Sequence, residues 1–291
     1  MPSLEVIAST LVSGVLLGGM LGLTALGLSI VLGVMRLVNL AHGGFLVVGA
    51  YAGFVLLART GIDPLIGLPL IGLGMGLVGY PLYRLLLAPF AGKGPEASLM
   101  TMFGVSIIVE NLLVLGFSAD TRSIDRAYAT TALTVGPISV PQIYVIGFCI
   151  SVVVILAVHG LIAHTAFGRD LRASADDPGA AAVVGVDLAR VHALTFALGA
   201  AAAGVGGTLM GVAFSFTPST GPSYLLNDFA IIVMGGLGNV LGTLVGGIVI
   251  GVLQSLGGLT LGDGYRDLVG LVLFLIVLTF RPQGFLRGRV G

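Results

Sequence analysis

Long apolar segments separated by short polar loops make up most of the chain. They can be placed at roughly 6–34, 43–58, 64–83, 97–117, 141–163, 191–214, 226–237, 240–257 and 266–280. A membrane-spanning helix needs about 20 mainly apolar residues, and most of these segments approach or exceed that length. None shows the alternation of a membrane β-barrel, so helices are the expected spanning structure. The pattern predicts an all-α, polytopic membrane helix bundle with eight or nine transmembrane segments.

Two of the apolar segments are interrupted by glycines and polar residues. The segment 226–237 has only twelve residues, and a glycine-rich break containing Asn239 separates it from the next one. A similar break, containing Asn39 and His42, precedes the segment 43–58. Irregular backbone at membrane depth is tolerated only inside protein or beside a wet cavity. We therefore expect broken or re-entrant helices at both places, and paired breaks of this kind favour a transport site near the midplane.

The distribution of lysine and arginine predicts the orientation of the chain, because cytoplasmic loops carry an excess of these residues. If the N-terminus is outside and each segment crosses once, nine of the thirteen basic residues are cytoplasmic, and four are outside. The cytoplasmic set is Arg36, Arg84, Lys93, Arg169, Arg172, Arg190, Arg281, Arg287 and Arg289, and the outer set is Arg59, Arg122, Arg126 and Arg266. The expected topology is N-out and C-in.

The most polar stretch of the chain is a predicted cytoplasmic loop at about 165–190. Asp177 is a good helix N-cap, Pro178 suits the first helical position, and Gly185 suits a left-handed C-cap. The sequence therefore predicts a short capped helix, of a form that another protein can bind. An ordinary loop with one helical turn is the alternative. The residues assigned to this docking role are Asp176, Asp177, Pro178, Ala181, Val184 and Gly185.

Composition agrees with a membrane protein and excludes several other classes. Hydrophobic residues make up 56% of the 291 residues and charged residues 9%, against about 25% charged in soluble domains. The formal net charge is zero, which gives no basis for nucleic-acid binding. Cys149 is the single cysteine, so no internal disulfide can form. The sequence contains neither a nucleotide-binding loop nor a nucleophile motif. We expect no catalytic residue, no metal site and no cofactor in this chain.

Polar residues within apolar segments are costly in a membrane and usually mark function. Glu110 and Asn111 are adjacent, and they are interpreted as lining a pore or gate. The alternative is hydrogen bonding between helices. Together with Asn39, His42 and Asn239, they form the hypothetical substrate pathway.

Glycine is unusually abundant, with 47 residues, and many glycines recur at four-residue spacing. Small residues at this spacing let helix backbones approach closely in lipid. The spacing predicts tight helix packing at Gly14, Gly18 and Gly22, at Gly242 and Gly246, and at Gly247 and Gly251.

Four stretches resemble the permeases of branched-chain amino acid ABC importers. They are GLSIVLGVMRLVNLAHGGFLVVGAY from Gly27, ASADDPGAAAVVGVDLARVHALTFALGAAAAG from Ala173, DFAIIVMGGLGNVLGTLVGGIVIGVLQSL from Asp228 and YRDLVGLVLFLIVLTFRPQGFLRGR from Tyr265. The match covers essentially the whole chain. The Asn-Leu-Ala-His-Gly element resembles the LivH-type subunit more than its LivM-type partner.

The resemblance implies a single transmembrane permease domain over residues 1–291, multi-pass in the bacterial inner membrane. It implies pairing with a second, LivM-type permease in the lipid bilayer. Two cytoplasmic ATP-binding subunits would bind ATP and dock on the pair, with Asp177–Val184 as the coupling helix. A periplasmic substrate-binding protein would deliver the amino acid.

Alternatives to this function concern both the cargo and the class of protein. The same importer class also carries urea, short amides and other small polar solutes, and Glu110 stands where family members often carry Gln. A self-contained secondary transporter or channel would transport when reconstituted alone. A membrane enzyme would need a catalytic constellation that the sequence lacks.

Overall fold

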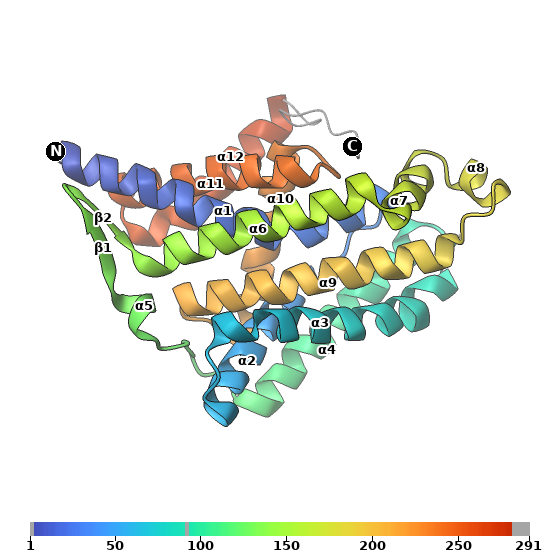
Figure 1. Ribbon diagram of the computed structural model, residues 1–291, viewed down its shortest axis with the longest axis horizontal. Coiled ribbons are helices and arrows are strands. Elements are labelled where there is room, and N and C mark those ends of the chain that lie inside the picture. Colours follow the sequence, from blue (N-terminus) through green and yellow to red (C-terminus); the bar gives the residue numbers. More distant parts are fainter. Residues whose placement is uncertain (1–2, 91–92, 281–291) are drawn as a thin grey trace.

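The computed structural model describes residues 3–90 and 93–280, and it is a helical bundle with one small β-hairpin (Figure 1). Arg281, Arg287 and Arg289, which were expected to be cytoplasmic, lie outside the described residues. The helices are α1 (Leu4–Met35), α2 (His42–Thr60), α3 (Pro64–Leu82), α4 (Pro95–Phe117), α5 (Ala127–Thr130), α6 (Gln142–His164), α7 (Ala166–Asp176), α8 (Pro178–Val183), α9 (Leu188–Ala213), α10 (Gly221–Gly235), α11 (Val240–Leu261) and α12 (Arg266–Phe280).

Seven helical stretches in the described part of the chain are long and apolar enough to cross a membrane. They are Leu4–Met35, His42–Thr60, Pro64–Phe90, Glu96–Phe117, Gln142–His164, Leu188–Ala213 and Val240–Leu261. The described parts of α10 and α12 have 15 residues each. A helix of that length is about 22 Å long, shorter than a hydrocarbon core of about 30 Å. The total of eight or nine segments and the N-out, C-in topology stay predictions.

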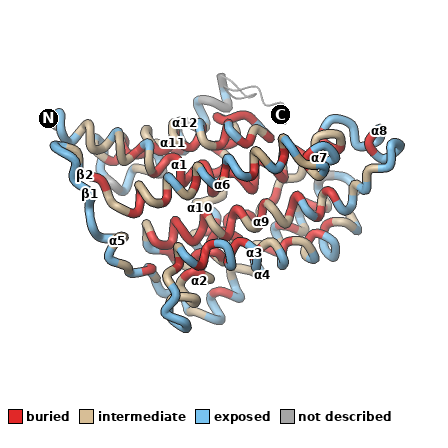
Figure 2. Tube along the Cα trace, viewed as in Figure 1, coloured by how far each residue is buried: buried red, intermediate tan, exposed pale blue. Residues whose placement is uncertain are grey.

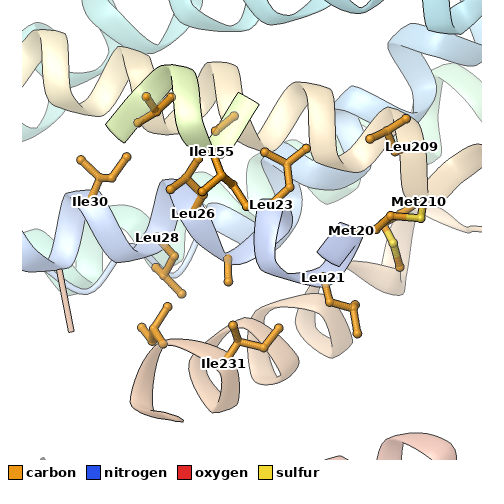
Figure 3. Close-up of a cluster of buried hydrophobic side chains, with 14 of the residues drawn as sticks. Met20, Leu21, Leu23, Leu26, Leu28, Ile30, Ile155, Leu209, Met210 and Ile231 are labelled. Atoms are coloured by element: carbon orange, nitrogen blue, oxygen red, sulfur yellow. The ribbon is translucent and has the colours of Figure 1, made fainter. Parts of the chain in front are cut away.

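Helix α1 is the centre of the bundle, and α6, α9, α10 and α11 pack around it. Buried residues gather on α1, α9 and α11, whereas α8 and the hairpin are mostly exposed (Figure 2). Leu23, Leu26 and Ile30 of α1 lie in a core cluster with Ile155 of α6 and Leu209 of α9 (Figure 3). Because lipid is as apolar as leucine, such a core is held by close packing more than by exclusion of water.

Glycines allow α1 and α11 to pack with their backbones in contact. A Cβ added at Gly18 would lie 2.5 Å from the carbonyl oxygen of Gly247, and one at Gly14 would lie 2.7 Å from the Cα of Val252. On the facing helix α11, a Cβ added at Gly251 would lie 2.5 Å from the carbonyl oxygen of Gly14 in α1. The tight packing predicted from the four-residue spacing is confirmed for this pair of helices.

The loop between α4 and α6 carries a β-hairpin and lies at the same end of the bundle as the N-terminus (Figure 1). Strands β1 (Ala132–Val135) and β2 (Ile138–Pro141) pair antiparallel. The backbone amide of Ser139 donates a hydrogen bond to the hydroxyl of Ser9 at 3.2 Å. The hairpin is thereby tied to the first turns of α1.

A polar cluster connects the α2–α3 loop to α5 at this end of the bundle. Tyr128 donates its hydroxyl proton to Asp63 at 2.8 Å, and the Arg126 Nε lies 3.4 Å from the same carboxylate. Burial of the phenol and its hydrogen bond to Asp63 raise the pKa of Tyr128 above its ordinary value. The cluster holds two loops that are far apart in sequence against each other.

Candidate functional site

The first predicted break separates α1 from α2, and it turns the chain back into the bundle. Arg36 ends α1 in a left-handed conformation with φ of 50°, and helical structure resumes only at His42. The His42 ring reaches Thr24, which lies 11 residues before the end of α1. Eleven helical residues span about 16 Å, so α2 begins deep inside the bundle.

Asn39 stabilises this non-helical backbone. Its side-chain oxygen accepts a hydrogen bond from the Ala41 amide at 3.0 Å, and the residue is almost completely buried. An unpaired amide at this depth would be costly, because no water is present to bind it. The structure therefore gives Asn39 a role in backbone conformation.

The second predicted break lies between α10 and α11, which pack against each other as a hairpin. Gly236 and Gly238 have φ angles of 87° and 77°, a conformation that favours glycine. Asn239 accepts a hydrogen bond from the Gly242 amide at 2.9 Å and so caps the start of α11. The break expected from the sequence is present, and Asn239 has a backbone role similar to that of Asn39.

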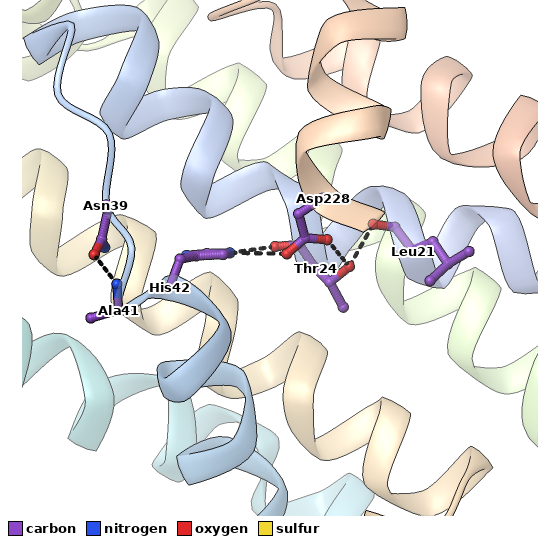
Figure 4. A network of polar contacts seen from close by, with 6 residues as sticks. All are labelled: Leu21, Thr24, Asn39, Ala41, His42 and Asp228. Atoms are coloured by element: carbon purple, nitrogen blue, oxygen red, sulfur yellow. Dashed lines mark hydrogen bonds and ion pairs between the residues drawn. The ribbon is translucent and has the colours of Figure 1, made fainter. Parts of the chain in front are cut away.

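A buried polar network joins the two broken regions to α1 (Figure 4). The Thr24 hydroxyl of α1 donates to Oδ1 of Asp228 in α10 at 2.7 Å. The His42 Nε2 of α2 lies 2.9 Å from the Thr24 carbonyl oxygen and 3.4 Å from Oδ2 of Asp228. Because a carbonyl oxygen only accepts hydrogen bonds, Nε2 carries a proton and donates it. All three residues are at most 1% exposed.

This network places a carboxylic acid beside an imidazole in the buried interior of the bundle. A buried charge is strongly unfavourable in a membrane unless it is paired. Pairing Asp228 with His42 and Thr24 therefore fixes α10, α2 and α1 in one register. The arrangement can hold two discontinuous elements against a central helix.

Asp228 was missed by the sequence reasoning, although it lies inside the predicted segment 226–237. An ionisable residue in an apolar segment needs a partner within the protein, and His42 is such a residue in another segment. This need for a buried partner is the feature of the sequence that indicates a role for Asp228. It does not identify the partner, because the two residues are 186 positions apart.

Glu110 and Asn111 lie apart from this network, on the outer part of α4. Asn111 is exposed, and its side-chain nitrogen donates to the Ile107 carbonyl oxygen of its own helix at 2.8 Å. Glu110 is partly exposed. The structure thus brings Asn39 and His42 together but does not join them to Glu110 and Asn111. A shared pathway for all these residues remains a prediction.

The predicted capped helix is present as α8. Asp177 accepts a hydrogen bond from the Ala180 amide at 3.0 Å, and Pro178 occupies the first turn. Gly185 has a φ of 93°, and the Val186 amide donates to the Ala181 carbonyl oxygen at 3.0 Å, as in a Schellman C-cap. The caps expected from the sequence are confirmed.

The surface of α8 differs from the expected one at one position. Ala181 is only 3% exposed, on a helix that contacts both α7 and α9. Val183 and Val184 are 89% and 77% exposed at the end of the segment, which projects from one end of the molecule (Figure 1). Helix α7 in turn packs against α6 and α1. Helix α7 therefore connects α8 with two helices of the bundle.

Comparison with known proteins identifies the family. The family model described as branched-chain amino acid transport system / permease component matches residues 10–278. The permease protein BraD of the high-affinity branched-chain amino acid transport system of Pseudomonas aeruginosa is 29% identical over 98% of this chain and 97% of its own length.

Two further relatives match most of the chain. The corresponding permease protein LivH of Escherichia coli is 29% identical over 94% of this chain and 93% of its own length. The permease protein LivM of Salmonella typhimurium is 26% identical over 90% of this chain and 66% of its own length. No solved structure matches the chain significantly. With its helical bundle and its family match over residues 10–278, the chain belongs to the family of permease components of branched-chain amino acid transport systems.

Proposed function

We propose that this chain is the membrane subunit of an ATP-driven importer of branched-chain amino acids, and that the ATP-binding subunits bind α8. The observation that carries the coupling role is the exposed end of α8, where Val183 and Val184 project into solvent on a doubly capped helix. Exposed apolar side chains on a rigid helix fit a groove in a partner protein.

The partners follow from the family and from the absence of an ATP site in this sequence. Similarity to proteins named LivH and LivM supports pairing with a second permease of LivM type. Two cytoplasmic ATP-binding subunits would dock on the pair, and a periplasmic binding protein would deliver the substrate. The whole of 1–291 forms one permease domain in the bacterial inner membrane, N-out and C-in, with its coupling loop at about 165–190.

Transport in this proposal is driven by movement of α8. Closure of the ATPases moves α8, and α7 passes the movement to α6 and α1. The Thr24–His42–Asp228 network keeps α2 and α10 attached to α1 as it moves. Alternating access then results from rocking of the bundle, with the energy supplied by the partners.

A pair of matched variants tests the coupling role. Val184→Glu places a charge on the exposed end of α8, and Val135→Glu places the same charge on β1, where valine is also 77% exposed. Both variants should fold and insert, because neither valine contributes to the core. We expect Val184→Glu to lose co-purifying ATP-binding subunits and L-leucine uptake, and Val135→Glu to retain both. Normal subunit binding and uptake with Val184→Glu would refute the docking role.

Urea and short amides remain alternative cargo for the same importer. Competition experiments separate them from amino acids. Excess L-isoleucine and L-valine should inhibit uptake of labelled L-leucine, whereas urea and acetamide should not.

A further inference from the structure

Two cavities lie one after the other along a single face of α1. The outer cavity, of about 630 Å³, is open on one side and lined by α1, the β-hairpin, the start of α6, the end of α11 and the start of α12. The inner cavity, of about 260 Å³, is lined by α1, α9, α10, α11 and α12. Arg266, at the start of α12, lines both cavities. The two spaces are therefore adjacent.

The two cavities follow one another along the length of α1. Glu5, Ser9 and Ser13 line the outer cavity, and Leu17 and Leu21 line the inner one. Each step of four residues turns only about 40° around a helix, so these five positions form a continuous stripe that winds slowly around α1. Thr24 follows on this side of α1. The stripe therefore leads from the N-terminal end of the bundle to the buried network at Thr24.

The chemistry of the outer cavity differs from that of a lipid-facing groove. Hydroxyl groups of Ser9, Thr10, Ser13 and Ser255 line it, and an acid and a base, Glu5 and Arg266, are both part of its wall. Lipid tails offer no partner to such charged and hydroxyl groups, so this lining favours water or a polar ligand over lipid. Ligand sites commonly have volumes of about 300–1,000 Å³, a range that includes this cavity.

The inner cavity offers a complementary, mixed environment. Leu17, Leu21 and Met210 supply apolar surface, and Asn227 and Gln254 supply amide groups. The Gln254 Nε2 donates to the Asn227 Oδ1 at 3.1 Å, which links α11 to α10. Because Arg266 lines both cavities, a molecule that leaves the outer cavity meets this mixed surface next.

We infer that the outer cavity is a binding site for a free α-amino acid in its zwitterionic form, inside this subunit. The Glu5 carboxylate attracts the α-ammonium group, and the Arg266 guanidinium attracts the α-carboxylate. The hydroxyl groups replace part of its hydration shell, and Val6, Tyr144 and Leu259 in the same wall supply apolar surface for the side chain. Asn227, which lines the inner cavity, directly precedes Asp228 of the buried network in α10. The inference rests on the proposed function and assigns its substrate site to residues other than Glu110 and Asn111.

Cysteine labelling tests whether the cavity is wet and occupied by substrate. In a Cys149→Ala background of the complete complex in membrane vesicles, Ser13→Cys places the only thiol of this chain in the outer cavity. Val15→Cys is the matched control, because Val15 is 36% exposed and lies about 200° around the same helix. The probe is a membrane-impermeant sulfonated thiol reagent, applied from the periplasmic side.

We expect Ser13→Cys to react and Val15→Cys to stay unreactive. Saturating L-leucine should slow the reaction of Ser13→Cys several-fold, whereas leucinamide, which lacks the carboxylate, should not. Glu5→Gln, a change at an exposed residue, should raise the KM for L-leucine several-fold without lowering kcat. An unreactive Ser13→Cys, or a reaction rate that L-leucine leaves unchanged, would overturn the inference.

Uptake measured in the same vesicles separates this inference from the proposed function. If the vesicles take up L-leucine with ATP but Ser13→Cys does not react, or L-leucine does not slow its reaction, the importer function is correct and the proposed binding site is wrong. A protected thiol without ATP-driven uptake means that the cavity binds the amino acid and the importer function is wrong.

Discussion

Removing the imidazole of the buried network should destabilise the protein far more than removing an ordinary histidine. In His42→Leu, Asp228 keeps the Thr24 hydroxyl but loses the His42 ring at 3.4 Å, at a site that is 1% exposed. Loss of the neighbouring imidazole donor leaves the buried Asp228 carboxylate less well compensated, at a cost of about 3–5 kcal/mol. His159→Leu is the control, because His159 is partly exposed on α6.

The companion variant should cost less, and the double variant should recover stability. In Asp228→Leu, His42 Nε2 still donates to the Thr24 carbonyl oxygen at 2.9 Å, so no buried donor is left unpaired. Replacing both members of a buried pair by apolar residues of similar volume is often close to neutral. His42→Leu with Asp228→Leu should therefore be more stable than His42→Leu alone, by about 2 kcal/mol or more.

Reversible unfolding in mixed detergent micelles, followed by circular dichroism, measures all four members of this cycle. The free energies of unfolding give the coupling between the two side chains directly. If the costs of the two single variants simply add in the double variant, the network does not pair the two groups, and the account of the broken helices is wrong.

Two further predictions concern helix packing and the loops at the N-terminal end of the bundle. Gly18→Ala places a methyl group 2.5 Å from the Gly247 carbonyl oxygen and should lower the free energy of unfolding by about 1–3 kcal/mol. Gly74→Ala is the control and should cause no such loss, because its methyl group would meet no neighbouring helix within 4 Å. Thermal unfolding in detergent compares the two variants. Tyr128→Phe removes the hydrogen bond to Asp63 and should cost about 1 kcal/mol at neutral pH. Because the native pKa of Tyr128 is raised, the stability it adds is fully present below about pH 10 and is lost as the pH rises through the native pKa. The difference between Tyr128→Phe and the unaltered protein should therefore shrink above pH 10, and a constant difference would contradict the assignment.

The local features of this protein could be predicted from sequence because each depends on neighbouring residues. Asp177, Pro178 and Gly185 specify the ends of α8 through capping rules that act over a few positions. The glycine spacing predicted close packing for the same reason, since positions four apart share a helix face. The breaks before His42 and around Asn239 were visible as polar residues in apolar runs.

The features that depend on tertiary structure could not be predicted in this way. The pairing of Asp228 with His42 is set by how α10 and α2 meet at α1, which no local pattern encodes. Ala181 was expected to be part of a docking surface, but it is buried, because the way α8 lies against α7 and α9 is set by the tertiary structure. Glu110 has no interaction with the network, because α4 packs on the outer side of the bundle.

Reconstituted transport tests the central claim most directly. The complex that co-purifies with this chain is placed in proteoliposomes, and uptake of labelled L-leucine is measured with the binding protein outside and ATP inside. The account predicts accumulation that needs ATP, the binding protein and the partner subunits together. Accumulation by this chain alone, in the absence of ATP, would contradict the account and identify a self-contained carrier.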